Sequence, residues 1–215
     1  MKQRIEWNGI HVPHAPGVDA DAEALERAKR EIRRALGETP RDLKIAKKSI
    51  DARRGITFVY TVSAAMERIP AGAEKNHASL RICPEPAVER IHGTESLTHR
   101  PVIVGFGPAG MFAGLLLAEE GYAPLILERG GSVEERTAAV DRFIRDGILD
   151  ERTNIQFGAG GAGTFSDGKL TTRIGDPLVA WVMRMLADLG APEDILYKSK
   201  PHIGTDILCE VVQNA

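Results

Sequence analysis

Three glycines spaced as Gly105-x-Gly107-x-x-Gly110 are the residues of this sequence best suited to hold a phosphate group. They follow the apolar run 102–104 and precede an apolar helical pattern, and Glu128 ends the next apolar run. Such a turn offers backbone N–H groups and the positive end of a helix dipole to a pyrophosphate. A carboxylate after the second strand accepts hydrogen bonds from a ribose hydroxyl. The order predicts a dinucleotide site at which Glu128 disfavours a 2′-phosphate.

Each glycine of this turn has its own physical role. Gly105 permits the tight turn after the strand, and Gly107 lets the backbone approach a pyrophosphate because it has no side chain. Gly110, with Gly114 one helical turn later, allows the helix to pack closely on the strand. A β-α-β unit with a glycine-rich turn and no ligand is the structural alternative.

A second glycine-rich stretch, FGAGGAGTFSDGKLTT at 157–172, is close to a P-loop. A P-loop ends in Lys and then Ser or Thr, but Leu170 follows Lys169 here and cannot bind Mg²⁺. No long buried strand precedes the glycines, and no helix follows Lys169, because glycine and proline come within seven residues. We interpret the stretch as a shaped loop whose backbone approaches the same dinucleotide from the other side.

The N-terminal part has the pattern of a small α+β domain. Residues 18–36 predict an amphipathic helix, with Asp19 or Asp21 as its N-cap and Gly37 as its stop. Strands are expected at 4–11, on both sides of a turn within 43–62, and at 78–83. We predict a ferredoxin-like α+β domain over residues 1–90 and a polar linker over 91–100.

Residues 101–215 have a different pattern, typical of parallel α/β structure. Strands are expected at 102–104 and 123–127 and helices at 111–120, 132–146 and 177–189. Asp176 is the expected cap of the last of these helices, and Thr205 is the expected cap of a helical pattern that follows it. We interpret this part as the N-terminal portion of a Rossmann-type domain.

Composition excludes several classes of protein. The net charge of −2 implies no general attraction to nucleic acid or to an anionic membrane, and no apolar run is long enough to span a bilayer. The two cysteines, Cys83 and Cys209, form no CxxC pair, which predicts a reducing, cytoplasmic location. His11 and His14 have no nearby partner in the sequence, so we predict no metal site.

Four segments resemble known flavoproteins. The run VIVGFGPAGMFAGLLLAEEGYAPLILERG at 102–130 is similar to the flavin-binding segment of FAD-dependent oxidoreductases of the glutathione-reductase-like fold. The segments at 47–62, 154–173 and 200–206 resemble a family of largely uncharacterised bacterial FAD-dependent dehydrogenases. That family joins a small N-terminal α+β domain to a flavin domain.

The resemblance implies two sets of contacts with FAD. The first set would line the pyrophosphate and the adenosine ribose: Gly105, Gly107, Pro108, Ala109, Gly110, Glu128 and Arg129. The second set would approach the pyrophosphate and the flavin ring: Gly160, Gly161, Gly163, Thr164, Phe165, Ser166, Asp167, Gly168, Lys169 and Leu170. The resemblance supplies neither a catalytic residue nor a substrate.

We therefore expect an α/β protein in which a small α+β domain precedes an incomplete Rossmann-type FAD/NAD(P)-binding domain. The expected function is FAD-dependent oxidoreduction, with NAD(P)H as a candidate electron donor and neither nucleic acid nor membrane as a partner. The alternatives are an NAD-dependent dehydrogenase and a non-catalytic module whose N-terminal domain binds a partner or RNA. Because the later strands of such a domain are missing, we expect the N-terminal part of a longer flavoenzyme.

Overall fold

The computed structural model describes residues 3–83, 93–166, 168–172 and 174–215. The chain divides into two compact units. The first unit contains Met1–Glu89 and Leu196–Ser199, and the second contains Arg90–Ile195 and Lys200–Ala215. The first two residues of the predicted linker, 91 and 92, lie outside the described residues.

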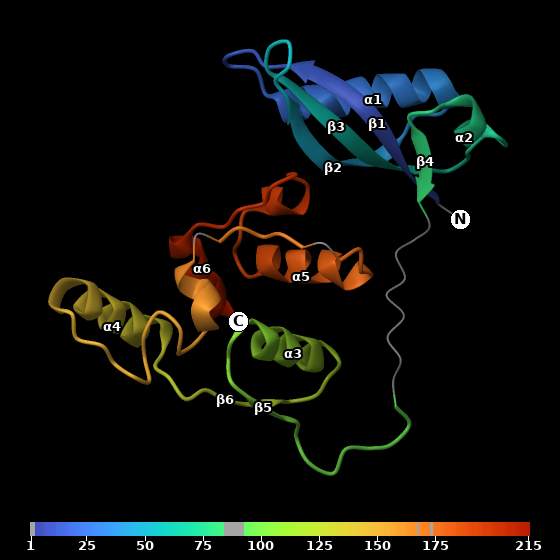
Figure 1. The fold of residues 1–215 in the computed structure, drawn as a ribbon. Helices are drawn as coiled ribbons and strands as arrows, with labels where there is room; N and C mark the ends of the chain where they lie inside the picture. Colours follow the sequence, from blue (N-terminus) through green and yellow to red (C-terminus); the bar gives the residue numbers. More distant parts are fainter. Residues whose placement is uncertain (1–2, 84–92, 167, 173) are drawn as a thin grey trace. The chain divides into compact units, whose positions relative to one another are not determined.

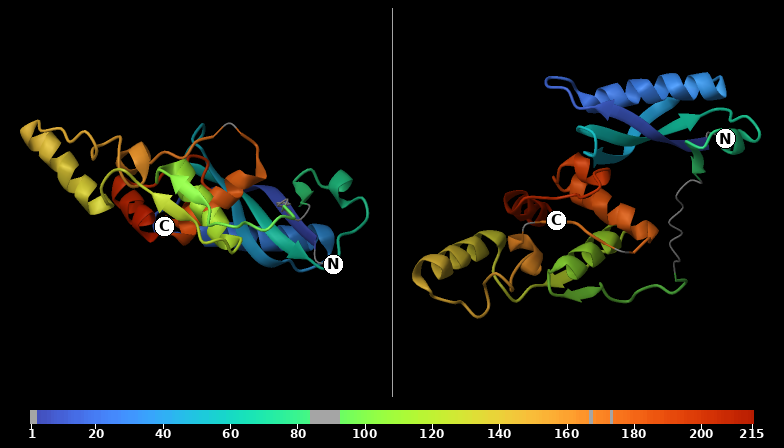
Figure 2. Two further views of the ribbon diagram at one scale, coloured as in Figure 1. Left: turned by 90° about the horizontal axis from the view of Figure 1, so that it is seen from below. Right: turned by 45° about the horizontal axis from the view of Figure 1, so that its top comes forward.

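The first unit is a four-stranded antiparallel sheet with a long helix along one face (Figures 1 and 2). Its elements are β1 (Gln3–Pro13), α1 (Ala20–Leu36), β2 (Arg41–Asp51), β3 (Thr57–Met66), α2 (Ala73–Asn76) and β4 (Leu80–Cys83). The strands are ordered β2-β3-β1-β4, and each neighbouring pair is antiparallel. The element order β-α-β-β-α-β is the one found in ferredoxin-like motifs.

Helix α1 is bounded by the capping signals of its own sequence. The Asp19 carboxylate accepts hydrogen bonds from the backbone N–H groups of Asp21 and Ala22 at 3.0 and 3.1 Å, which confirms Asp19 as the N-cap. Gly37 ends the helix with φ of 75°, a conformation that glycine adopts without strain. The buried residues of α1 recur at helical spacing: Ala24, Ala28, Ile32 and Leu36. They face the alternate residues of the sheet that form the same core: Ile5, Trp7, Ile10, Val12, Tyr60, Val62, Ala64 and Met66.

Residues Leu196–Ser199 belong to the first unit because they extend its sheet at β2. The backbone N–H of Lys48 donates to the carbonyl of Tyr197 at 2.7 Å, and the N–H of Ser199 donates to the carbonyl of Lys48 at 3.1 Å. The sequence around Tyr197 does not predict this pairing, since the segment is too short to show a strand pattern.

A polar cluster around Asp21 accompanies this pairing. The Asp21 carboxylate accepts hydrogen bonds from the Lys48 ammonium at 2.5 Å and from the hydroxyls of Tyr60 and Tyr197 at 2.7 and 3.3 Å. Burial raises the pKa of Asp21, but the hydrogen bonds from Lys48 and Tyr60 outweigh burial and leave that pKa below its ordinary value. The cluster therefore fastens α1, β2 and β3 together around one ionised carboxylate.

Among its described residues, the second unit combines a two-stranded parallel sheet with four α-helices. Its elements are β5 (Val102–Val104), α3 (Pro108–Glu119), β6 (Leu125–Leu127), α4 (Val133–Asp146), the 3₁₀ turn η1 (Gly161–Phe165), α5 (Pro177–Asp188), the 3₁₀ turn η2 (Glu193–Leu196) and α6 (Thr205–Asn214). The chain as a whole is therefore mixed α/β, as expected. The sequence does not predict the two 3₁₀ turns.

The caps of the last two long helices test two predictions. The Asp176 carboxylate accepts the N–H of Leu178 at 2.8 Å, so Asp176 caps α5 as predicted. Gly204 takes the N-cap position of α6, so the prediction of Thr205 as its cap is wrong. The hydroxyl of Thr205 instead donates to the carbonyl of Ser166 at 2.6 Å, and the tertiary partner replaces the local one.

Strands β5 and β6 pair in parallel, and α3 connects them (Figure 1). Ile103 and Ile126 pair across the strands, and their side chains lie close to Gly110 and Gly114 of α3. The other side of this small sheet exposes four apolar residues: Val102, Val104, Leu125 and Leu127. Val104 is 84% exposed, which is unusual because parallel sheets are commonly covered on both faces.

No helix within the described residues is long and apolar enough to cross a membrane.

Candidate functional site

The first glycine turn joins the end of β5 to the start of α3. Gly105 has φ of 97°, which favours glycine, and its N–H donates to the carbonyl of Leu127 at 2.7 Å, so the ends of β5 and β6 are held together. Gly107 is the N-cap of α3, and Pro108 takes the first helical position. A Cβ at Gly110 would lie 2.0 Å from the carbonyl oxygen of Gly105, which confirms the predicted close packing at this glycine.

The second glycine-rich stretch lies against this first turn. The N–H of Gly160 donates to the carbonyl of Phe106 at 2.7 Å. Gly161 has φ of 65°, and a Cβ there would lie 3.1 Å from the Cα of Gly107. Two glycine segments far apart in the sequence therefore meet at the N-terminus of α3, where the first-turn N–H groups of a helix have no intrahelical partner.

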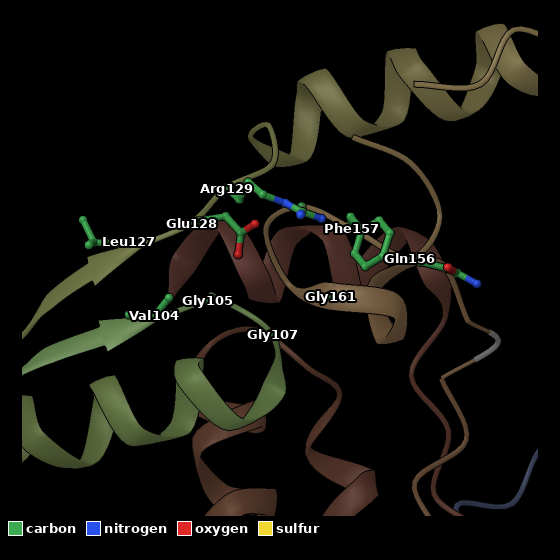
Figure 3. A pocket seen from close by; sticks show the side chains of 10 residues that line it. Val104, Gly105, Gly107, Leu127, Glu128, Arg129, Gln156, Phe157 and Gly161 are labelled. Carbon is green, nitrogen blue, oxygen red and sulfur yellow. The ribbon is translucent and has the colours of Figure 1, made fainter. Parts of the chain in front are cut away.

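A cavity of about 530 Å³ opens beside this meeting point, at the carboxyl ends of β5 and β6 (Figure 3). Its volume lies within the usual range of small-molecule sites, about 300–1,000 Å³. Ligands of open parallel sheets bind at such strand ends. The cavity is lined by Val104, Gly105, Gly107, Leu127, Glu128, Arg129, Gln156, Phe157, Gly158 and Gly161.

Glu128 lies in this cavity with both carboxylate oxygens bonded to the backbone. One oxygen accepts the N–H of Phe106 at 2.7 Å, and the other accepts the N–H of Gly130 at 2.8 Å. Burial raises the pKa of Glu128, but the backbone N–H groups outweigh burial and leave the pKa below its ordinary value. A carboxylate offers about four acceptor sites, so the ionised group still has capacity for a ligand hydroxyl.

Gln156 and Phe157, which the sequence did not indicate as ligand contacts, line the same cavity as Glu128. The Arg129 guanidinium lies over the Phe157 ring, 5.0 Å from its centre, and Figure 3 shows Arg129 extending toward that ring. Gln156 lies beside Phe157 in this lining. Phe157 is 45% exposed, and the tertiary structure places its ring in the lining of the cavity.

Arg136 is a second residue that sequence reasoning missed. It sits in the first turn of α4, which Ser132 and Glu135 start with a capping box. The side chain of Arg136 is fully buried and donates to backbone carbonyls within 154–161, the closest at 2.6 and 2.9 Å. A Cβ at Gly158 would lie 2.3 Å from Cδ of Arg136, so the glycine makes room for the arginine.

The predicted site residues fall into three groups. Five line the cavity: Gly105, Gly107, Glu128, Arg129 and Gly161. Eleven described ones are not in its lining: Pro108, Ala109, Gly110, Gly160, Gly163, Thr164, Phe165, Ser166, Gly168, Lys169 and Leu170. Asp167 lies outside the described residues. The contacts of these residues with a cofactor stay predictions.

The far end of the glycine-rich stretch pairs with another backbone segment. The N–H of Leu170 donates to the carbonyl of Pro201 at 3.0 Å, and the N–H of Ile203 donates to the carbonyl of Gly168 at 2.9 Å. A Cβ at Gly168 would lie 1.6 Å from the carbonyl oxygen of Ile203, so only glycine fits there. This end of the stretch is therefore anchored by residues 201–203 as well as by its own turn.

The described ranges contain no group of three or more His, Cys, Asp or Glu side chains that could hold a metal ion.

Comparison with known proteins gives one informative relative. No family model matches the sequence. An uncharacterized protein of Clostridium beijerinckii is 43% identical over 219 residues, and the match covers 98% of this chain and 39% of that protein. The chain thus spans about two fifths of the length of the curated relative it matches. Because the relative is uncharacterized, it carries no activity over to this chain.

Proposed function

We propose that the second unit binds the dinucleotide of an FAD-dependent oxidoreductase. The observation that carries this proposal is the meeting of two glycine segments at the N-terminus of α3, beside a cavity that also contains Glu128. Glycine at 107 and 161 leaves the backbone accessible there, and the helix dipole favours a negative charge. An acid after the second strand suits the adenosine ribose.

In this proposal each part of the site has a defined task. The backbone at Gly107 and Gly161 and the α3 N-terminus hold the diphosphate, while Glu128 accepts a ribose hydroxyl and disfavours a 2′-phosphate. Arg129 and Phe157 form the wall beside the ribose. Bound FAD would supply the redox chemistry by accepting a hydride at its ring and passing electrons on. The protein orients the cofactor and excludes water from one side of it.

The finer fold assignment belongs to the same proposal. We infer that β5-α3-β6 is part of a larger Rossmann-type sheet. The exposed apolar side chains of Val104 and Leu127 support this, because a parallel sheet in such a domain has both faces covered by other elements.

An NAD-dependent dehydrogenase remains the alternative, because the same turn and acid bind the adenosine half of NAD. NAD(P)H is also the candidate electron donor for the flavin. An RNA-binding role of the first unit has less support, because two basic residues of the β2-β3 hairpin are paired with acids. Lys48 lies 2.5 Å from Asp21, and Arg53 lies 2.7 Å from Asp51.

The visible absorption spectrum of the purified protein tests the proposal. We expect the spectrum of oxidised flavin, and release of FAD after denaturation. A colourless protein that binds NADH but not FAD would favour the dehydrogenase alternative. If residues 1–95 show no salt-dependent affinity for RNA, the RNA-binding alternative is ruled out.

A further inference from the structure

Arg136 carries a positive charge into the interior of the second unit, and the ionised carboxylate of Glu128 acts on it electrostatically without a direct ion pair. Its side chain is fully buried, and within the described residues no Asp or Glu oxygen lies within ion-pair distance of it. All of its hydrogen bonds go to neutral carbonyl groups, at Asn154, Ile155, Gly158, Ala159 and Gly161. The ring of Phe165 covers the guanidinium at 4.8 Å.

This arrangement is costly unless another charge balances it. Carbonyl dipoles satisfy the guanidinium N–H groups, and Glu128 offsets part of the charge, but a buried charge without a direct ion pair remains costly. Burial lowers the pKa of Arg136, yet a guanidinium remains charged in proteins. The positive charge of Arg136 would therefore stabilise an anion bound nearby, because charges interact strongly where water is excluded.

The carbonyls that hold Arg136 belong to the wall of the cavity. Gly158 and Gly161 line the cavity, and their carbonyl oxygens accept hydrogen bonds from Arg136 at 3.5 and 2.9 Å. The N–H groups of these same peptides point the other way. The N–H of Ala159 donates to the carbonyl of Gly131 and the N–H of Gly160 donates to the carbonyl of Phe106, so the wall is held between Arg136 on one side and Gly131 and the first glycine turn on the other.

We propose that Arg136 is a positioning residue for a diphosphate: it holds the 154–161 wall in place from behind and supplies the buried positive charge that favours the anion. This inference rests on the proposed function, because the diphosphate is that of the dinucleotide. Its two parts are separable. The hydrogen bonds set the shape of the cavity, whereas the charge sets the preference for an anionic ligand over a neutral one.

The test compares ADP with adenosine, which share base and ribose but differ in the diphosphate. Calorimetric titrations use the full 215-residue chain and two variants, Arg136→Met and Arg136→Lys. We expect Arg136→Met to weaken ADP binding by about tenfold or more and adenosine binding by less than about threefold.

Arg136→Lys separates charge from shape, because lysine keeps the charge but loses the fork of hydrogen bonds. We expect both ligands to bind more weakly to it, with the ratio of ADP to adenosine affinity preserved. If circular dichroism shows that Arg136→Met does not fold, Arg136→Lys still tests the inference. If folded Arg136→Lys protein no longer prefers ADP over adenosine, the role of the charge is refuted.

Other outcomes would also overturn the inference. Equal weakening of ADP and adenosine in Arg136→Met would mean that Arg136 only supports the fold. Failure of the wild-type chain to prefer ADP would remove the diphosphate site. If the ADP preference depends on Arg136 but the purified protein holds no flavin, the proposed function fails and this inference stands. If neither variant changes the affinity for flavin, the inference about Arg136 is overturned and the proposed function stands.

Discussion

Two alanine substitutions in the first glycine turn should separate a glycine needed for packing from one needed for binding. A Cβ at Gly110 would lie 2.0 Å from the carbonyl oxygen of Gly105, where ordinary contact begins near 3.4 Å. The obstacle is backbone and cannot rotate away. At Gly107 the nearest neighbour of an added Cβ among the described residues is the Cα of Gly161, at 3.9 Å, and the backbone is extended with φ of −79°.

These distances set the expected magnitudes. Gly110→Ala must move α3 away from β5 by more than an ångström, so we expect the free energy of unfolding to fall by about 3 kcal/mol, the upper end of ordinary overpacking. Gly107→Ala should change it by no more than about 0.5 kcal/mol. The added methyl group of Gly107→Ala nevertheless occupies the approach to the diphosphate. We expect its affinity for FAD to fall by at least about tenfold, or about 1.4 kcal/mol.

Urea unfolding measures the first quantity, and titration with FAD followed by flavin fluorescence measures the second. Both use the same purified protein, and circular dichroism confirms that Gly107→Ala keeps the fold. Wild-type affinity in a folded Gly107→Ala protein would show that no diphosphate lies against this backbone. Wild-type stability of Gly110→Ala would refute the close packing of α3 on the first turn.

Three further predictions concern single residues. Glu128→Gln leaves one backbone N–H without an acceptor and should lower the free energy of unfolding by about 1–3 kcal/mol. The pKa of Glu128 lies below its ordinary 4.5, so the ionised carboxylate should stabilise the wild type fully above pH 4.5 and lose this effect on further acidification. Urea unfolding at several pH values should show this loss in the wild type and not in the glutamine variant. Asp21→Asn breaks the pairing with Lys48 and should lower the free energy of unfolding by about 1–2 kcal/mol. Amide hydrogen exchange at β2 should become faster, and unchanged exchange would contradict the role of the Asp21 cluster. Gly161→Val, at φ of 65°, should weaken FAD binding, and wild-type affinity in the folded variant would count against a role of Gly161 at the cofactor.

Local signals in the sequence were enough to place most elements. Asp19 and Gly37 bound α1, and Asp176 caps α5, because a cap needs only backbone groups one turn away. The same holds for the first glycine turn, whose packing at Gly110 involves residues within a few positions in the sequence. Thr205 failed as a cap because its hydroxyl found a distant partner in Ser166.

The sequence alone determined the existence of a strand, a glycine turn, a helix and an acid in the order that suits a dinucleotide. It did not determine which residues surround the cavity. Arg136 reads as one charged position among many on a helix, and only its burial among the carbonyls of 154–161 distinguishes it. The approach of Gly161 to Gly107 and the bonding of Glu128 to the backbone likewise needed the tertiary structure. The reason is that turns and caps depend on neighbours in the sequence, whereas burial and long-range pairing depend on the packing of the whole unit.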